Sequence, residues 1–213
     1  MKQQDLNDKK AGEILELIPE YDDFEYYLCS DEIIDFNADS ISALGEKIKT
    51  ESKNKIDYVK LSFEYVRDKI GHSGDMKGKT VTCKASDVLK YGEGICFAKS
   101  HLLCALLRYG GIPSGMCYQS LMFDHAHTPY LILHGLNGVY IEKIGRWIRL
   151  DARGNKKGVD AQFSLDEEKI AFHVKEEGEK DDPIVYAKPK QNVIDALTKY
   201  KTVSELWTNL PKP

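Results

Sequence analysis

The 213-residue sequence lacks any long hydrophobic run. A helix that spans a membrane needs about 20 consecutive apolar residues, and no stretch of this chain approaches that length. The first ten residues, MKQQDLNDKK, also lack the apolar core of a secretory signal peptide. With 42% hydrophobic and 30% charged residues, the composition is that of a globular protein. We therefore expect a soluble, cytoplasmic protein that makes no contact with a membrane.

Cysteines are few and irregularly spaced. The sequence has five, an odd number, and contains no C-x-x-C pair. This pattern argues against a disulfide framework and against a structural zinc site, so we expect reduced thiols. Asp124, His125 and His127 form a small cluster, but adjacent loop histidines with no further ligand nearby are usually solvated, and these could instead line a cleft. We expect no metal and no cofactor.

Basic residues are not clustered. The formal net charge is -4, and the one charged run, residues 176–182, is acidic and typical of a solvated loop. A protein that binds nucleic acid usually carries a basic patch or stripe. The charge pattern therefore predicts no nucleic-acid partner.

Cys96 has a distinctive setting. The segment GEGICFAKSHLLCALLRYGGIP (residues 92–113) places its thiol where a glycine-rich turn enters a helix. The free N–H groups and the positive dipole at a helix start favour a thiolate and therefore a nucleophile. The other four cysteines lack this setting, and we predict structural roles for them: Cys29, Cys83, Cys104 and Cys117.

A histidine and a carboxylate follow Cys96 on strand-like segments. His134 lies in the apolar run PYLILHGL (residues 129–136), and Asp151 ends the alternating segment WIRLD. Nucleophilic catalysis by cysteine needs an imidazole that transfers the proton and a polar group that orients the imidazole. The sequence therefore predicts Cys96 as nucleophile, His134 as base and Asp151 as orienting group.

Three more residues are candidates for the oxyanion site or the cleft. His72 lies in a loop upstream of Cys96, where it could donate to an oxyanion or complement a helix C-terminus. Gln119 lies in a predicted strand. Trp147 precedes Asp151 in its strand, and we favour core packing beneath the site for it.

The order of the predicted elements is helices first and antiparallel strands afterwards, which predicts an α+β fold with a central helix from residue 95 on the sheet. We predict one domain over residues 1–213, with a core at about 38–175. Helices are predicted at residues 40–49, 53–70, 85–91, 192–199 and 203–206, with a short one at 11–17. Strands are predicted at residues 114–122, 130–144, 147–152 and 170–174, and residues 24–28 look extended.

The strand that contains His134 has one alternative end. Asn137 and Gly138 form a type I′ hairpin signal, so the strand could turn there. We favour a strand that continues through Ile141, because Gly145 and Arg146 offer a second turn before Trp147.

Taken together, the segments around Cys96, His134 and Asp151 resemble the transglutaminase-like superfamily, a group of papain-like cysteine enzymes, and in particular its small bacterial members. The resemblance covers residues 65–155 and implies a papain-like core in which these three residues form a Cys-His-Asp triad. It implies acyl transfer on an amide or peptide bond through a thioester, with hydrolysis as the expected outcome and transamidation as a variant. The substrate would be a peptide, a protein or a small amide.

Two other readings of the sequence remain open. A papain-like cleft could hold a peptide or a partner protein without turnover. An acyltransferase that takes its acyl group from a thioester cofactor would use the same three residues, although we find no sequence that would bind such a cofactor.

Overall fold

A computed structural model describes residues 14–125 and 127–213 of the chain. Its elements, in order, are β1 (Ile18–Pro19), the 3-10 helix η1 (Phe24–Tyr27), α1 (Asp39–Glu51), α2 (Lys55–Lys69), β2 (Gly71–His72), α3 (Ala85–Tyr91), β3 (Glu93–Gly94), α4 (Cys96–Tyr109), β4 (Ser114–His125), β5 (Thr128–Ile141), the 3-10 helix η2 (Glu142–Ile144), β6 (Arg146–Leu150), β7 (Lys180–Asp181), β8 (Ile184–Val185), α5 (Gln191–Lys199) and α6 (Val203–Trp207).

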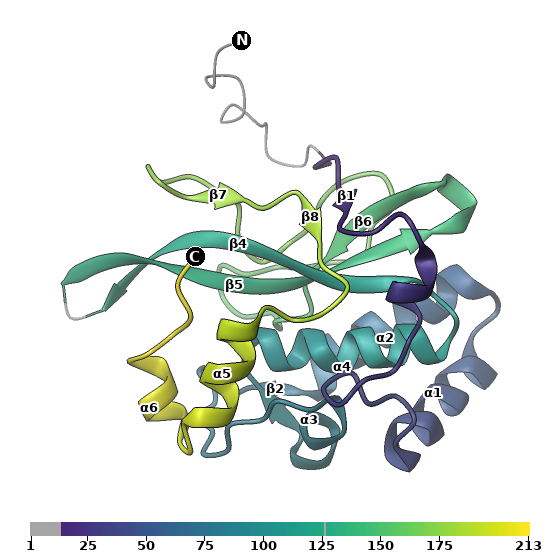
Figure 1. The fold of residues 1–213 in the computed structure, drawn as a ribbon, viewed down its shortest axis with the longest axis horizontal. Helices are drawn as coiled ribbons and strands as arrows, with labels where there is room; N and C mark the ends of the chain where they lie inside the picture. Colours follow the sequence, from purple (N-terminus) through teal and green to yellow (C-terminus); the bar gives the residue numbers. More distant parts are fainter. Residues whose placement is uncertain (1–13, 126) are drawn as a thin grey trace, which may run out of the picture.

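The helices and the main sheet form two layers. The sheet has the strand order β6-β5-β4-β7 with antiparallel neighbours, and the helices lie together on one of its faces (Figure 1). Helix α4 lies next to the sheet and is buried along almost its whole length. The α+β class and the buried central helix that the sequence predicts are therefore confirmed.

Helix α2 shows how the sequence pattern produces this layer. Val59, Phe63 and Val66 recur at the spacing of one helix face and are buried in the main core. Asn54 caps the helix start, because its side-chain oxygen accepts the backbone N–H of Asp57 at 3.1 Å. The prediction of a helix over residues 53–70 is confirmed to within two residues at each end.

Strand β5 continues through Asn137 and Gly138, the pair that could have formed a hairpin turn. Gly138 pairs with Gly115 on β4 and with Arg149 on β6, so it lies in the middle of the sheet. Asn137 donates its side-chain amide to the carbonyl of Ser100 in α4, at 2.9 Å, rather than forming a turn. The chain reverses at Gly145, which has a φ of 64°. The preferred continuation of the strand through Ile141 is confirmed.

Three local predictions differ from the structure. Residues 24–27 form a 3-10 helix instead of an extended segment, because the side chain of Asp23 accepts the N–H of Glu25 at 2.9 Å. Residues 170–174 form no strand, since the edge of β4 at Gln119 is paired with Asp181 of β7. Residues 14–17 are not helical, and the rest of the predicted helix at 11–17 lies outside the described residues.

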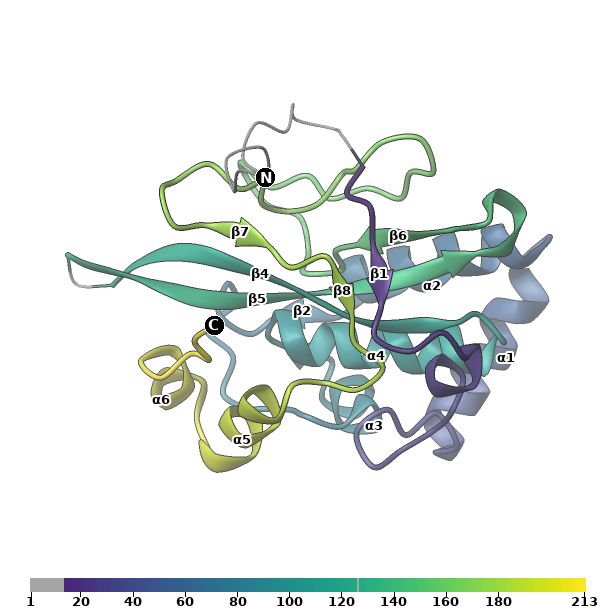
Figure 2. The same ribbon diagram turned by 45° about the horizontal axis from the view of Figure 1, so that its top comes forward.

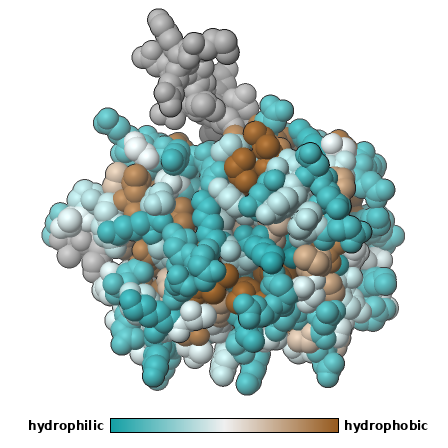
Figure 3. Space-filling view, in the orientation of Figure 1, coloured by the Kyte–Doolittle hydropathy of each residue, from teal (hydrophilic) through white to brown (hydrophobic). Residues whose placement is uncertain are grey.

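The face of the sheet opposite the helices is covered by loops and by the segment that contains β1, as Figure 2 shows. A second apolar cluster lies there, formed by Tyr27, Cys117, Leu136, Trp147, Ile170, Val185 and Ala187. The molecular face drawn in Figure 3 is mainly hydrophilic, with small separated hydrophobic patches. None of the helices in the described part of the chain is long and apolar enough to cross a membrane.

The C-terminal segment returns to the main hairpin. Helix α6 begins with the predicted capping box, in which Thr202 and Glu205 satisfy each other's backbone N–H groups. Beyond it, the carbonyl of Pro211 accepts the backbone N–H of Leu133 on β5 at 2.8 Å. The end of the described chain therefore contacts the strand that carries His134.

Candidate active site

Cys96 is the first residue of α4 and is half-buried. The residue that precedes the helix, Ile95, has an extended backbone and an apolar side chain that cannot accept a hydrogen bond. The N–H groups of the first helical turn are therefore not capped by a side chain at that position. The Cys96 sulfur therefore lies next to the partial positive charge of the helix start, as the sequence predicts.

Gly94 allows the turn before Cys96 to pack closely against the start of α4. It belongs to β3, which pairs in parallel with β2 and sets Gly94 opposite His72. A Cβ atom at Gly94 would lie 2.9 Å from the Cβ of Ala98 and 3.1 Å from Oγ1 of Thr82. Only glycine therefore lets the turn before Cys96 pack this tightly against the first turn of α4.

Gly135 does the same on the strand side. A Cβ atom there would lie 2.5 Å from Cδ1 of Phe97 and 3.3 Å from its Cα. Strand β5 consequently approaches the first turn of α4 closely at the residue next to His134. This approach brings the His134 imidazole to the Cys96 side chain, and the two interact.

Asp151 holds the other side of the imidazole. Its Oδ2 atom lies 2.8 Å from Nε2 of His134, and the carboxylate is fully buried. The backbone N–H of Arg153 donates to Oδ1 at 3.1 Å, and that of Ala171 donates to Oδ2 at 3.0 Å. The structure thus brings together Cys96, His134 and Asp151 in the arrangement predicted from the sequence.

The charges of the three groups are coupled. Burial disfavours the charged imidazole, but the negative charge of Asp151, followed by that of Cys96, outweighs burial and raises the pKa of His134 to about 10. Burial likewise opposes ionisation of Asp151, and the charge and hydrogen bond of His134 outweigh it, so that the pKa of Asp151 is lowered. The pair is therefore stabilised as an imidazolium and a carboxylate at neutral pH.

His72 lies beside this group. It is buried, its Nδ1 atom has no hydrogen-bond partner among the described residues, and that atom is 3.8 Å from Oδ2 of Asp75. Burial, followed by the charge of Arg153, lowers the pKa of His72 to about 3. Its ring meets Trp207 of α6 edge-on, with 6.3 Å between centroids. His72 is therefore a neutral imidazole at physiological pH.

Gln119 is the cross-strand neighbour of His134 and is fully buried. Its side-chain nitrogen donates to the carbonyl of Phe172 at 3.1 Å and to Oδ1 of Asp181 at 2.9 Å. The ring of Phe172 packs edge-on against His134, with 5.2 Å between centroids. The amide group of Gln119 is thus bound both to the loop that covers the imidazole and to β7, which leaves no donor for an oxyanion.

Trp147 is not brought to the other candidates. It pairs with Tyr140 on β5, six residues from His134, which corresponds to about 20 Å along a strand. Its ring packs against Tyr27 in the second apolar cluster and against the exposed Phe24. The side chain therefore serves core packing, as we favoured, but at a distance from the candidate site.

Two features of the site were not predicted. Arg153 forms a two-pronged ion pair with Asp75, at 2.6 and 2.9 Å, and packs over the ring of Phe172. Lys99, one turn after Cys96, is fully buried and donates to the carbonyls of Arg67 and Ile70 at the end of α2. A lysine within a helix sequence rich in apolar residues was the available signal for Lys99, whereas the partner of Arg153 lies far away in the sequence.

The structure describes the predicted loop cluster only in part. Asp124 and His127 flank the tip of the β4–β5 hairpin, Ala126 lies outside the described residues, and so does the side chain of His125. Within the described residues, no group of three or more His, Cys, Asp or Glu side chains could hold a metal ion.

Residues 42–152, from α1 to the residue after Asp151, match the family model of the transglutaminase-like superfamily. The chain belongs to this superfamily. The match includes all three residues of the candidate site, and it supports a cysteine-dependent enzyme. No curated protein matches the chain.

Three solved structures are similar to this superfamily member over part of their length. A protein described as a "putative cysteine protease" from Cytophaga hutchinsonii has a TM-score of 0.50 and 22% identity, over 66% of this chain and 46% of its own. A structure described as a TGase has a TM-score of 0.39 and 19% identity, over 82% and 48%. The periplasmic domain of TgpA from Pseudomonas aeruginosa, bound to ethylmercury, has a TM-score of 0.41 and 15% identity, over 52% and 42%. The chain thus spans less than half the length of each of these structures.

Proposed function

We propose that this protein catalyses acyl transfer from an amide or peptide bond through a thioester on Cys96. The observation that carries the proposal is the position of the His134 imidazole, which interacts with Cys96 on one side and lies 2.8 Å from the Asp151 carboxylate on the other. A thiol at a helix start, an imidazole and an orienting carboxylate are the groups that cysteine-based nucleophilic catalysis requires.

In the first half of the reaction, the Cys96 thiolate attacks the carbonyl carbon of the substrate and forms a C–S bond. The His134 imidazolium donates its proton to the leaving nitrogen, the C–N bond breaks, and an amine departs. Asp151 keeps the imidazole oriented and stabilises its charged form. The acyl group then remains on Cys96 as a thioester.

The oxyanion of the tetrahedral intermediate needs preorganised donors. We assign one to the backbone N–H of Cys96, because it lies in the uncapped first turn of α4. His72 is our candidate for the second donor, since its buried, neutral ring lies beside the site and its Nδ1 atom has no hydrogen-bond partner among the described residues. Gln119 would act as a positioning residue through Phe172.

In the second half, a nucleophile attacks the thioester carbon, His134 takes its proton, and the C–S bond breaks to restore Cys96. With water as the acceptor the reaction is hydrolysis, and with an amine it is transamidation. We propose hydrolysis of a peptide or small amide as the main activity.

Intact mass spectrometry tests the proposal directly. The full chain is incubated with a library of peptides and small amides, and an acyl adduct is sought on Cys96. The expected result is a transient adduct that the Cys96→Ala variant loses and the Cys29→Ala variant keeps, because Cys29 is an exposed thiol whose carbonyl is bound by Arg108, near the opposite end of α4 from Cys96. Faster loss of the adduct on addition of an amine would assign transamidation. Stable, non-covalent peptide binding without an adduct would replace the enzyme by a peptide-binding module.

A further inference from the structure

A large cavity lies at the far end of α4 from Cys96. It has a volume of about 780 Å³, within the usual range for small-molecule sites. Its wall is formed where α2 begins, where α4 ends, and where β5 leads into η2. Most of its lining is apolar, from Ile56, Val59, Ile112, Pro113, Tyr140, Ile141 and Leu165.

The cavity is separate from the candidate active site. Helix α4 has 14 residues, so its two ends lie about 20 Å apart, and Cys96 occupies the opposite end from Gly111. The distance along β5 from His134 to Tyr140 is also about 20 Å. The cavity therefore plays no part in the acyl transfer proposed above.

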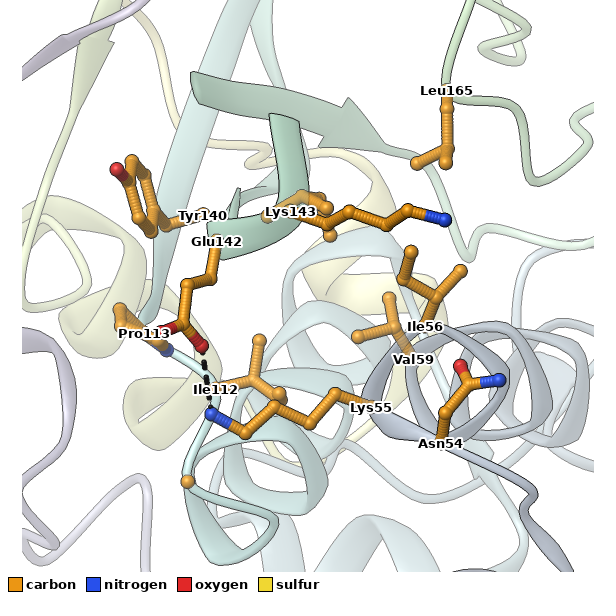
Figure 4. Close-up of a pocket in the computed structure, with 12 residues that line it drawn as sticks. Asn54, Lys55, Ile56, Val59, Ile112, Pro113, Tyr140, Glu142, Lys143 and Leu165 are labelled. Carbon is orange, nitrogen blue, oxygen red and sulfur yellow. Dashed lines mark hydrogen bonds and ion pairs between the residues drawn. The ribbon is translucent and has the colours of Figure 1, made fainter. Parts of the chain in front are cut away.

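Three charged side chains surround the cavity. Lys55 and Glu142 form an ion pair at 2.9 Å on one side of its mouth (Figure 4). Lys143 extends across the cavity from the η2 turn, and its ammonium group points toward Leu165 and Ile56. Within the part of the chain that the structure describes, no acidic side chain pairs with Lys143. The cavity thus presents two positive charges and one negative charge around an apolar interior.

We propose that this cavity binds a small amphipathic carboxylate, with its apolar body inside the cavity and its carboxylate on Lys143. The apolar lining selects a hydrocarbon or aromatic body, because burying such a body releases water from apolar surface on both sides. The positive charge without an acidic partner selects an anion, since an ion pair with Lys143 would balance the charges around the cavity.

The experiment uses the full chain and two probes of matched length and opposite charge, dodecanoate and dodecyltrimethylammonium, both below the concentration at which they form micelles. Calorimetry gives the affinity, and amide NMR shifts locate the site. Dodecanoate is expected to bind at least about tenfold more tightly than the cation, with its largest shifts at residues 54–59, 111–113 and 140–143. Equal binding of the two probes, or shifts centred elsewhere, would overturn the proposal.

Two variants and a control complete the test. Lys143→Glu reverses the charge and should weaken dodecanoate binding at least about tenfold, whereas Lys188→Glu makes the same charge change at an exposed lysine outside the cavity and should alter it less than twofold. Leu165→Ala trims the apolar wall and should weaken both probes. Dodecanoate binding that is unchanged in Lys143→Glu would refute the assignment of the carboxylate.

Discussion

Asp151 uses one carboxylate oxygen for two partners: Oδ2 lies 2.8 Å from Nε2 of His134 and accepts the backbone N–H of Ala171 at 3.0 Å. Ala171 is followed by Phe172, whose ring packs against the same imidazole. The carboxylate therefore positions both the histidine and the segment that shields it from water. A change at Asp151 is therefore expected to affect the His134 imidazole directly.

The Asp151→Asn variant should lose most of its reactivity while keeping its shape. An asparagine would remove the negative charge that stabilises the imidazolium. If its amide group faced Nε2, it would favour the imidazole tautomer that has no proton on that nitrogen. We expect the rate of thioester formation on Cys96 to fall by about 100-fold or more. The matched control is Asp166→Asn, an exposed carboxylate outside the site, which should leave the rate unchanged.

Thiol labelling should single out Cys96. With limiting iodoacetamide near pH 7, Cys96 should react faster than Cys29 even though Cys29 is the more exposed of the two. Cys117 should react slowly, because burial raises the pKa of its thiol to about 12. Peptide mapping by mass spectrometry measures each rate in the same sample.

The His134→Asn variant extends that measurement. It should slow the labelling of Cys96 and leave that of Cys29 unaltered, because only Cys96 interacts with the His134 ring. The control His127→Asn changes an exposed histidine at the tip of the β4–β5 hairpin and should affect neither rate. Equal labelling of Cys96 in the two variants would mean that His134 does not activate the thiol.

Stability should pass through a maximum near pH 6.5. On the acid side, burial lowers the pKa of His72 to about 3 and that of His101 to about 4, so between pH 4 and 6.5 the unfolded state binds more protons than the folded state. The free energy of unfolding must then rise with pH, by up to about 1.4 kcal/mol per unit and group.

On the alkaline side, His134 dominates. Its pKa is about 10 in the folded protein, whereas the unfolded chain releases this proton near pH 6.5, so stability is lost as the pH rises above that value. Above pH 8 the deprotonation of Lys99, whose pKa burial lowers to about 8, offsets part of the loss. Urea unfolding between pH 4 and 9 measures the profile, and His134→Asn should flatten its decline between pH 6.5 and 8.

Gly135→Ala should disturb the site through packing alone. The added methyl group would collide with Phe97, so β5 must move away from the first turn of α4. We expect a loss of about 1–3 kcal/mol in the free energy of unfolding and slower labelling of Cys96. The control is Gly158→Ala, in an exposed turn where an added methyl group meets no other atoms. Its loss of stability comes only from the φ of 82°, which is unfavourable for alanine. Slower labelling in Gly158→Ala as well would show that the effect is not local to β5 and α4.

The sequence predicted the elements that depend on local pattern. Helix periodicity located α2, the glycines around Cys96 located the start of α4, and the second turn signal at Gly145 settled where β5 ends. The grouping of Cys96, His134 and Asp151 followed from their order along the chain on helix and strand segments, together with the resemblance to the superfamily.

What the sequence did not reveal depends on long-range packing. The buried side chain of Gln119 donates hydrogen bonds to the carbonyl of Phe172 and to Asp181. Asp181 is in reach because β7 pairs with β4, and no local sequence pattern predicts that pairing. Arg153 forms an ion pair with Asp75, which is 78 residues earlier in the sequence, so no local pattern predicts the pair. The segment 170–174 has the composition of a strand but packs as a loop, since β7 occupies the edge of the sheet.

The hydrogen bond from Leu133 to Pro211, together with the contact of Phe172 with His134, bears on where the protein can be divided. The superfamily match ends at residue 152, yet both of these supports for β5 come from beyond it. A fragment trimmed to the matched region would keep all three reactive side chains and lose the parts that hold the imidazole still. The smallest unit that keeps the geometry of the reactive centre is therefore larger than the region that the family model matches.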